Sequence, residues 1–315
     1  MPSSKYPRVS VIGAGGVGSS LARSLHETGY SIVSVISRSG HSALALARAV
    51  KCKKAGTVVG DISPLSEIIL IAVPDGAVAE IAKELSRSKT LKFKKLFVAH
   101  ASGVLSADVL EPLKRKGATV ASIHPVQSFP SASIHPGGAG STSKLKGIYF
   151  GIEGEPKAIA RAEQLVSTIG GKSIIVPRDL KPLYHVACVF ASGYMVVFLN
   201  AISELAKCLG LKASWTEVFG PLMTTAMENS VKHTTANALT GPILRGDLAT
   251  VDCHLLALSK HAPEFLPLYT IGGIEVARIA KDHGRISRQE YDGIISRFRK
   301  FIRTSPIKHK SREKH

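Results

Sequence analysis

The sequence has few cysteines, and their arrangement excludes two kinds of site. The four cysteines, Cys52, Cys188, Cys208 and Cys253, show neither the paired spacing of a metal site nor that of a redox motif. We therefore expect reduced packing residues in a cytoplasmic protein. The first residues also lack the pattern of a signal peptide, because the first apolar run has the length of a short strand.

Aromatic and acidic residues are also scarce. Aromatic residues make up 6% of the chain, and no stretch interleaves them with basic residues as nucleic-acid-binding surfaces often do. The net charge of +18 is then the one feature that favours a nucleic acid as a binding partner. A basic protein attracts phosphorylated cofactors and membrane surfaces as well. We expect a small-molecule partner, no nucleic acid and no membrane. We interpret residues 304–315 as a basic, disordered tail, with weak anion binding as the alternative.

An apolar, β-branched run from Val9 to Ile12 leads into the pattern Gly-x-Gly-x-x-Gly, and a helical pattern follows at once. This context is typical of a dinucleotide-binding turn. The first glycine makes the tight turn, the second lets the backbone approach a pyrophosphate, and the third lets the helix lie close to the sheet. The helix N-terminus offers free N–H groups to the phosphates. The cofactor-binding residues predicted here are Gly13, Ala14, Gly15, Gly16, Val17 and Gly18.

The second predicted strand, 31–36, ends in Ser37, Arg38 and Ser39. In NAD-specific folds an acidic residue commonly stands here and binds the ribose 2′-hydroxyl. An arginine flanked by two hydroxyls suits a 2′-phosphate instead, so the sequence favours NADP over NAD. The alternative is a surface arginine in a loop.

Strand and helix patterns alternate through the first half of the chain, which predicts an α/β fold with a doubly wound, mostly parallel Rossmann sheet. Polar clusters follow three buried strands, at 73–75, 100–103 and 124–130. Because ligands lie outside the carboxyl ends of such strands, we expect these clusters to line a site. The predicted strands are 8–13, 31–36, 57–59, 68–73, 96–99, 119–123, 148–152 and 173–176, and the predicted helices are 17–28, 41–50, 77–85 and 156–169. A Gly-, Ser- and Pro-rich loop is predicted over 131–143.

No strand pattern recurs after residue 178, so we predict an NAD(P)-binding domain over 1–178 and an all-α substrate and dimerisation domain over 179–303. The stretch 183–203 is almost uncharged and long enough to resemble a membrane span. It contains His185, Ser192 and Asn200, so we interpret it as a helix buried all round in a core or a subunit interface. We therefore expect a homodimer. Further helices are predicted over 213–232, 247–261, 263–282 and 287–303.

This organisation resembles the 6-phosphogluconate dehydrogenase-like superfamily, which includes pyrroline-5-carboxylate reductase, ketopantoate reductase and the deazaflavin-dependent NADP reductases. It is most similar to a family of Rossmann-like oxidoreductases whose C-terminal half is a domain of unknown function. The resemblance spans residues 8 to 303, and one departure is Gly193, where an asparagine is expected. The motifs that carry it are 73–75, 100–103, 124–130, Tyr184-His185, Ala191-Ser192, 240–242 and 245–247.

The resemblance to pyrroline-5-carboxylate reductase implies that the strand ends near 98–104 and 123–125 run beside the nicotinamide. It therefore implies contacts with the reactive end of the cofactor. The residues concerned are Val73, Pro74, Ser102, Gly103 and His124. Asp75, which follows Pro74, is also predicted to bind the cofactor.

Hydride transfer to a carbonyl or imine carbon also needs a proton donor, and histidine is the natural one at neutral pH. His185 lies four residues after Lys181, on the same helix face, and this pair ranks first for proton relay or for binding substrate charge. His124 ranks second, and it can instead bond the nicotinamide or fix its loop. His100 follows a neighbouring strand. Each can equally be a structural histidine, and their spacing predicts no metal site.

The predicted substrate-binding residues are Tyr184, Ser192, Thr240 and Arg245. The planar fork of Arg245 suits a carboxylate or phosphate, although it can instead pair with a neighbour, while Asp247 is expected to cap a helix. The sequence thus predicts an NADP-dependent oxidoreductase for a small anionic carbonyl, imine or hydroxy-acid substrate. The alternative is a non-catalytic NADP-binding regulatory or interaction protein.

Overall fold

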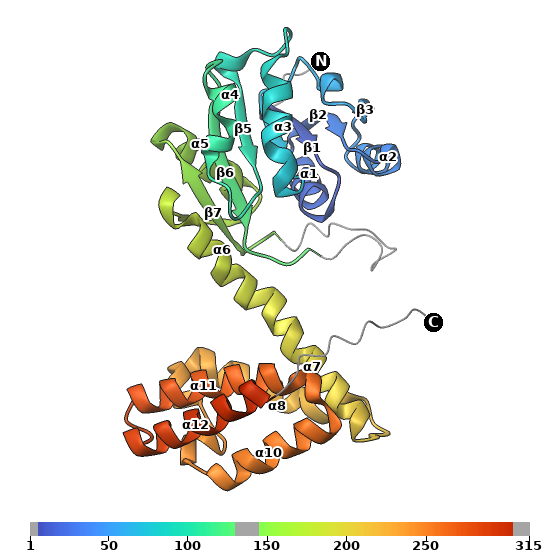
Figure 1. Ribbon diagram of the computed structural model, residues 1–315. Helices are drawn as coiled ribbons and strands as arrows, with labels where there is room; N and C mark the ends of the chain where they lie inside the picture. The colour runs from blue at the N-terminus through green and yellow to red at the C-terminus, as the bar shows by residue number, and fades with distance from the viewer. Residues whose placement is uncertain (1–5, 130–144, 305–315) are drawn as a thin grey trace. The chain divides into compact units, whose positions relative to one another are not determined.

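The computed structural model describes residues 6–129 and 145–304. The chain divides into two compact units, Met1–Gly193 and Tyr194–His315, which are described separately below (Figure 1). The predicted loop over 131–143 and the predicted tail beyond residue 304 lie outside the described residues.

The first unit is built on one sheet, in which the described residues form eight strands in the order β3-β2-β1-β4-β5-β6-β7-β8. Strands β1 to β6 run parallel, β7 is antiparallel to β6, and β8 is parallel to β7. The predicted doubly wound, mostly parallel sheet is confirmed. The strands are β1 (Arg8–Ile12), β2 (Ser31–Ile36), β3 (Ala55–Gly56), β4 (Ile68–Ile71), β5 (Phe97–His100), β6 (Thr119–Pro125), β7 (Tyr149–Gly154) and β8 (Lys172–Ile175).

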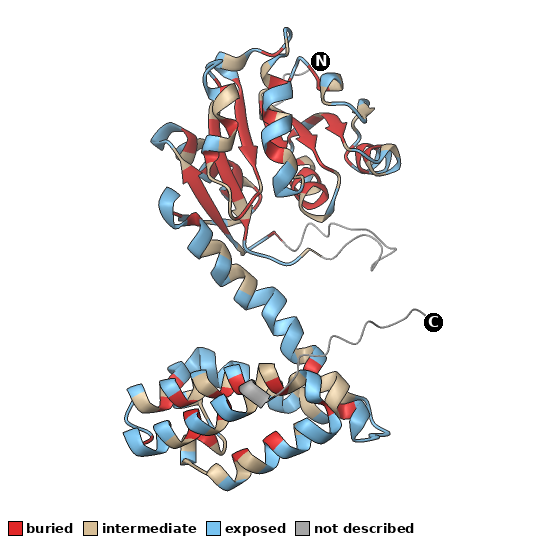
Figure 2. Ribbon diagram, in the orientation of Figure 1, coloured by how far each residue is buried: buried red, intermediate tan, exposed pale blue. Residues whose placement is uncertain are grey.

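Helices cover both faces of this sheet. Residues of α1 (Gly16–Glu27), α2 (Gly40–Ala49) and α5 (Pro156–Thr168) share one core with the strands. Residues of α3 (Asp75–Ser86) and of the segment Ala107–Lys114, which contains α4 (Glu111–Lys114), share the other. Figure 2 shows the strands as the most continuously buried part of the unit. Continuous apolar runs such as Ile68–Ile71 become strands because both of their faces are buried in this way.

One predicted strand is wrong. The sequence predicts a strand over 57–59, but the pairing with β2 involves Ala55 and Gly56 only. A 3-10 turn, Val59–Asp61, follows shortly after this strand. Gly60 and Asp61 favour turns, so the chain bends here and the β-branched residues just before them do not form a strand.

The apolar stretch predicted as one helix forms α6 (Lys181–Val189), a π-helical turn (Phe190–Tyr194) and α7 (Met195–Cys208). The prediction that it is buried in a core of its own chain is wrong, since Leu183, Phe190 and Val196 are 66%, 58% and 62% exposed. Among the described residues, this helix alone is long and apolar enough to span a membrane, with a mean hydropathy of 1.9, which is weak evidence for a span. Burial in a subunit interface stays a prediction, and light scattering of the purified protein tests it.

The second unit has a small helical core. Its helices after α7 are α8 (Trp215–Lys232), α9 (Thr235–Ala238), α10 (Leu248–His261), α11 (Leu266–Asp282) and α12 (Arg288–Thr304). Val251, Leu255 and Phe298 are fully buried in it. A Cβ at Gly273 of α11 would lie 2.5 Å from Phe298, so the missing side chain lets α11 and α12 pack closely. Asp247 caps α10 by accepting the Thr250 N–H at 3.0 Å, which confirms the predicted cap.

The first compact unit ends at Gly193, after the predicted domain boundary at residue 178. The last strand does end before residue 178, as the pattern predicts. Helix α6 nevertheless belongs with the sheet, because its first residues pack on the strand ends. Lys181 is fully buried there, and Tyr184 bonds to His124 of β6.

Candidate functional site

The glycine-rich turn between β1 and α1 has the geometry of a phosphate cradle. Gly13 has a φ of +105°, and a Cβ there would lie 2.0 Å from the Ala72 carbonyl oxygen. A Cβ at Gly18 would lie 1.9 Å from the Gly13 carbonyl oxygen, whereas one at Gly15 would meet no heavy atom within 4 Å. The first and third glycines are therefore required by packing, and the second leaves the backbone open to a ligand.

Helix α1 begins beside that open position. Gly15 is its N-cap, no described side chain caps it, and its first turn holds no acidic residue. The N-terminal N–H groups and the positive end of the helix dipole are thus available to an anion. The turn stands between β1 and β4, at the point where the strand order reverses, which is where ligands bind in doubly wound sheets. The residues present fit the pyrophosphate of a dinucleotide.

Arg38 follows β2 at the same edge of the sheet. Its side chain is exposed, and no hydrogen bond or ion pair joins it to another described residue. Ser39 accepts the Ser42 N–H at 3.2 Å and so caps α2, while Ser37 is half-buried and donates its N–H to Gly56. Arg38 is therefore the free group among the three. Of the cluster after β4, Val73 packs beside the Gly13 turn, and Pro74 and Asp75 begin α3.

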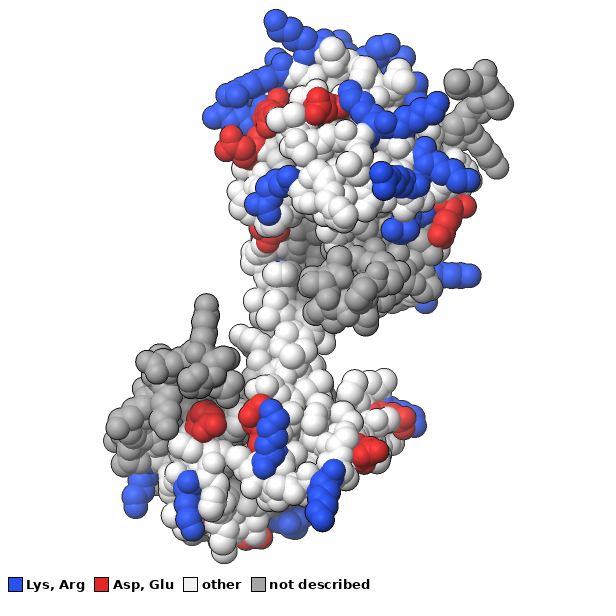
Figure 3. All heavy atoms as spheres, turned by 90° about the vertical axis from the view of Figure 1, so that its right-hand side faces the viewer, with Lys and Arg blue, Asp and Glu red and all other residues white. Residues whose placement is uncertain are grey.

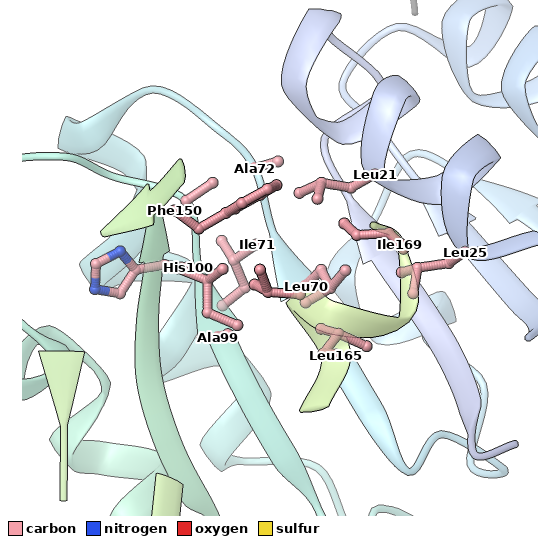
Figure 4. A pocket seen from close by; sticks show the side chains of 13 residues that line it. Leu21, Leu25, Leu70, Ile71, Ala72, Ala99, His100, Phe150, Leu165 and Ile169 are labelled. Carbon is pink, nitrogen blue, oxygen red and sulfur yellow. The ribbon is translucent and has the colours of Figure 1, made fainter. Parts of the chain in front are cut away.

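Toward the carboxyl ends of β5 and β6, the sheet formed by β5, β6 and β7 has one apolar face and one polar face. The apolar face packs under α5 and carries Phe97, Ala99, Ala121, Ile123, Phe150 and Ile152. The alternate positions carry His100, Ser122, His124, Gly151 and Glu153. Figure 4 shows the His100 ring pointing away from the apolar side chains that surround Ala99. The apolar space in that view measures about 10 Å³, which is too small for a ligand.

His100 is a structural histidine. It is 1% exposed, its Nδ1 accepts the Ser102 N–H at 3.2 Å, and its Nε2 lies 3.1 Å from the Ser106 carbonyl oxygen. Nδ1 therefore carries no hydrogen, and Nε2 donates to Ser106. Burial lowers the pKa of His100 to about 4, although the Ser106 carbonyl opposes this. A neutral ring with both nitrogens bonded fixes the loop after β5 and is not free for proton transfer.

Lys181 of α6 is fully buried against the polar face. Its Nζ donates to Ser122 Oγ at 2.6 Å and lies 3.4 Å from the Ser102 carbonyl oxygen. Burial lowers its pKa to about 8, and the negative charges of Glu153 and Asp75 oppose that shift. Because the ammonium group is engaged with the ends of β5 and β6, it holds these strand ends and does not face solvent. The role in relay or substrate binding predicted for Lys181 stays a prediction.

His124, Tyr184 and His185 form a cluster beside that lysine. The Tyr184 hydroxyl lies 2.7 Å from His124 Nδ1, and the rings of His124 and His185 meet edge to face with centroids 5.8 Å apart. Burial lowers the pKa of His124 to about 4, and the neighbouring His185 and Lys181 add to this effect. Two of the residues predicted for catalysis and one predicted for substrate binding are thus in contact.

Two glycines make room for this cluster. A Cβ at Gly103 would lie 2.5 Å from His185 Cδ2 and 2.9 Å from His124 Nε2. A Cβ at Gly151 would lie 2.5 Å from the Tyr184 hydroxyl oxygen. Gly103 therefore admits the two histidines to the end of β5, and Gly151 admits the tyrosine to β7.

The other three predicted substrate-binding residues are described by their local contacts. The Ser192 hydroxyl donates to the Cys188 carbonyl of its own helix at 2.7 Å. Thr240 and Arg245 belong to the second unit, where both are exposed. Hydrogen bonds from Thr250 are the main cause that lowers the pKa of Asp247, and the charge of Arg245 adds to it. Thr240 and Arg245 are described within that unit only.

Sequence reasoning missed Ser122, Gly151 and Glu153. Glu153 is 5% exposed, and its carboxylate accepts the Ala107 N–H at 2.6 Å. The signal that could have found them is the period of two in β6 and β7, where polar or small residues alternate with large apolar ones. The strands predicted from the sequence rest on their apolar positions alone.

A wider crevice of about 260 Å³ lies between α4 and the β7–β8 edge. The charged groups that line it already have partners. Lys114 pairs with Glu155, Arg178 pairs with Asp108, and Glu153 accepts the Ala107 N–H. The cluster around His124 and the Gly13–Gly18 turn therefore form the better candidate site.

Comparison with known proteins agrees with this architecture. Residues 3–125 match the model of a Rossmann-like domain, and residues 148–274 match that of a domain of unknown function, DUF2520. No curated protein matches the chain significantly.

Several solved structures share the fold. A candidate NADP oxidoreductase from Bacteroides fragilis is 23% identical, with 88% of this chain and 100% of that chain covered and a TM-score of 0.72. A protein from Thermotoga maritima is 24% identical, with coverage of 87% and 99% and a TM-score of 0.63. An imine reductase from Myxococcus stipitatus, solved with NADP+, is 16% identical, with coverage of 94% and 94% and a TM-score of 0.54. The chain thus combines a Rossmann-like domain with a DUF2520 domain, and it shares its fold with these solved structures.

Proposed function

We propose that this protein is an NADP(H)-dependent oxidoreductase that acts on a small anionic carbonyl, imine or hydroxy-acid substrate. One observation carries the proposal. An open phosphate cradle at Gly15 and a cluster of histidines at the ends of β5 and β6 occupy the same edge of one sheet. That edge is where a doubly wound sheet binds an extended dinucleotide.

The residues suit NADP better than NAD. An arginine without a described partner follows β2, where NAD-specific folds commonly have a carboxylate. A guanidinium group binds a phosphate with two parallel hydrogen bonds. Lys and Arg also outnumber Asp and Glu on the face of the first unit visible in Figure 3, so the field of this basic chain favours anionic ligands.

The chain itself supplies orientation and a proton route. Bound NADPH would supply the hydride, and the residues of the polar face would hold the substrate and move the proton. His185 is the proposed proton donor, since it lies beside His124 at Gly103 and is only half-buried. Lys181 is the proposed support beneath them, because it joins Ser122 to the Ser102 carbonyl. Arg245 stays a proposed ligand for a substrate carboxylate or phosphate.

Cofactor choice is tested by thermal unfolding with NADP or NAD. A ligand at about 100 times its Kd adds about 2.7 kcal/mol to the stability, so NADP should raise Tm by several degrees and NAD by less. Arg38→Asp should remove most of the shift with NADP and leave that with NAD. Arg48→Asp is the matched control, because Arg48 is exposed near the other end of α2 and its variant should keep the preference for NADP. Equal shifts with both dinucleotides would overturn the argument from Arg38.

Turnover separates an enzyme from a cofactor-binding regulator. Oxidation of NADPH is followed with α-keto acids, cyclic imines and semialdehydes as substrates. An enzyme should give at least one substrate whose reduction is lost in His185→Ala, while NADPH still raises Tm. Binding of NADPH with no turnover across the set would favour the non-catalytic alternative.

A further inference from the structure

A hydrogen bond joins the Tyr184 hydroxyl to the ring of His124. The phenolic oxygen is 2.7 Å from Nδ1, and the two rings are nearly perpendicular, at 89°. Tyr184 comes from α6 and His124 from β6, so the packing of the helix on the sheet sets this bond. A tyrosine hydroxyl can donate or accept, and the neighbours of Tyr184 decide which it does.

The surroundings of the hydroxyl make it the donor. The missing side chain of Gly151 lets the phenolic oxygen lie against β7, where a Cβ would come within 2.5 Å of it. The hydroxyl has one hydrogen to donate. Its close acceptor among the described residues is His124 Nδ1, at 2.7 Å. If Nδ1 carried the hydrogen instead, the hydroxyl would have to donate to a much weaker acceptor such as the sulfur of Cys188, which influences its pKa.

We propose that Tyr184 is a positioning residue that keeps His124 neutral with its hydrogen on Nε2, so that His124 offers a substrate carbonyl or imine a fixed hydrogen-bond donor instead of acting as a base. The inference rests on the proposed function. It changes the role of Tyr184, which the sequence assigns to substrate binding.

The other nitrogen of His124 is placed for such a role. Nε2 lies against Gly103, where a Cβ would come within 2.9 Å of it, and no described residue forms a hydrogen bond with Nε2. His185 lies beside it. A donor on Nε2 polarises a carbonyl oxygen or an imine nitrogen, and the proton that completes the reduction then comes from a different group, for which His185 is adjacent.

The charges around His124 favour the neutral ring. Burial is the largest influence that lowers the pKa of His124 to about 4. The positive forms of His185, Lys181 and His100 act in the same direction, and Asp75 acts against them. Burial also raises the pKa of Tyr184, so the hydroxyl keeps its hydrogen near neutral pH.

The test is long-range ¹H–¹⁵N spectroscopy of the full chain labelled at histidine, from about pH 5.5 to 8.5, a range around the ordinary histidine pKa. The His124 signals are assigned from their loss in His124→Gln. They should show the Nε2–H form and should not titrate in this range. In Tyr184→Phe the signals should change to a mixture of the two neutral forms. Tyr149→Phe is the matched control. Tyr149 is the first residue of β7, two positions before Gly151, and it is 47% exposed. Its loss of a hydroxyl should leave the His124 signals unchanged.

Three results would overturn the proposal: an Nδ1–H form in the unsubstituted protein, a His124 titration with the ordinary pKa, or an unchanged Nε2–H form in Tyr184→Phe. If Tyr184→Phe does not fold, Gly151→Ala serves as the second variant. It keeps the hydroxyl but places a Cβ 2.5 Å from it, so it should disturb the same signals. These spectra need no cofactor, and thermal shifts with NADP test the proposed function separately. Failure of one is therefore distinguishable from failure of the other.

Discussion

The two faces of β5, β6 and β7 differ although the same three strands build them, because alternate residues of each strand point to opposite faces. On one face, fully buried side chains such as Phe97, Phe150 and Ile152 pack under α5. On the other, His100 and Ser122 are as deeply buried, but each is held by hydrogen bonds. The apolar face gains stability from area removed from water. The polar face buries less apolar area and is stabilised less by it, but its side chains form a set of oriented hydrogen-bond donors and acceptors.

Residues on the apolar face stabilise the fold, whereas residues on the polar face determine the geometry of the site. A change on the apolar face should act on the whole unit through lost packing. A change on the polar face should act through pH dependence and local geometry. Three substitutions test this division.

Phe150→Ala should have the largest effect. Phe150 is fully buried between α5 and the sheet, so its truncation removes apolar contacts and leaves a cavity that costs about 3–5 kcal/mol. Urea unfolding measures the loss. The control is Ile174→Ala on β8, where Ile174 is 38% exposed and the loss should be much smaller. Equal losses at the two positions would contradict the division between the faces.

Lys181→Met should change how stability depends on pH. Burial lowers the pKa of Lys181 to about 8 from 10.5, so the unfolded chain binds more protons at this residue between those values. The destabilising contribution of the buried charge is then fully present below about pH 8 and is relieved as the pH rises toward 10.5. The unfolding free energy of the unsubstituted protein, relative to Lys181→Met, should therefore rise by at most about 2 kcal/mol between about pH 7 and 9.5.

Parallel urea unfolding of the two proteins across that range measures the difference. Lys172→Met is the control, because Lys172 is an exposed lysine on β8 and its variant should follow the unsubstituted protein at every pH. A constant difference between Lys181→Met and the unsubstituted protein would show that the buried ammonium group carries no such penalty.

Gly103→Ala should have the smallest effect on stability and a local effect on the site. The added Cβ would meet side-chain atoms of His185 and His124, which can shift, so the cost should be about 1 kcal/mol. The histidine ¹⁵N signals should move, because both rings must give way. Gly220→Ala in α8 adds a Cβ that meets nothing within 4 Å, and it should stabilise the helix slightly. Unmoved His124 and His185 signals in Gly103→Ala would contradict the described contact.

The local sequence pattern was sufficient to predict the parts of the site that are formed by the backbone. Gly13 and Gly18 could be assigned because a strand, a tight turn and a close helix leave no room for side chains there. The ends of β5 and β6 could be found because parallel strands finish at one edge. The cap at Asp247 could be found because capping is a contact between residues three apart.

The sequence by itself therefore determined the Rossmann sheet, the phosphate turn and the helical nature of the second half. Only the tertiary structure decided that Lys181 bonds to Ser122, that Tyr184 bonds to His124 and that α6 packs on the sheet. The reason is physical. Turns, caps and periodicity depend on neighbours along the chain, whereas these bonds join residues about sixty positions apart, whose meeting depends on how the helix packs across the finished sheet.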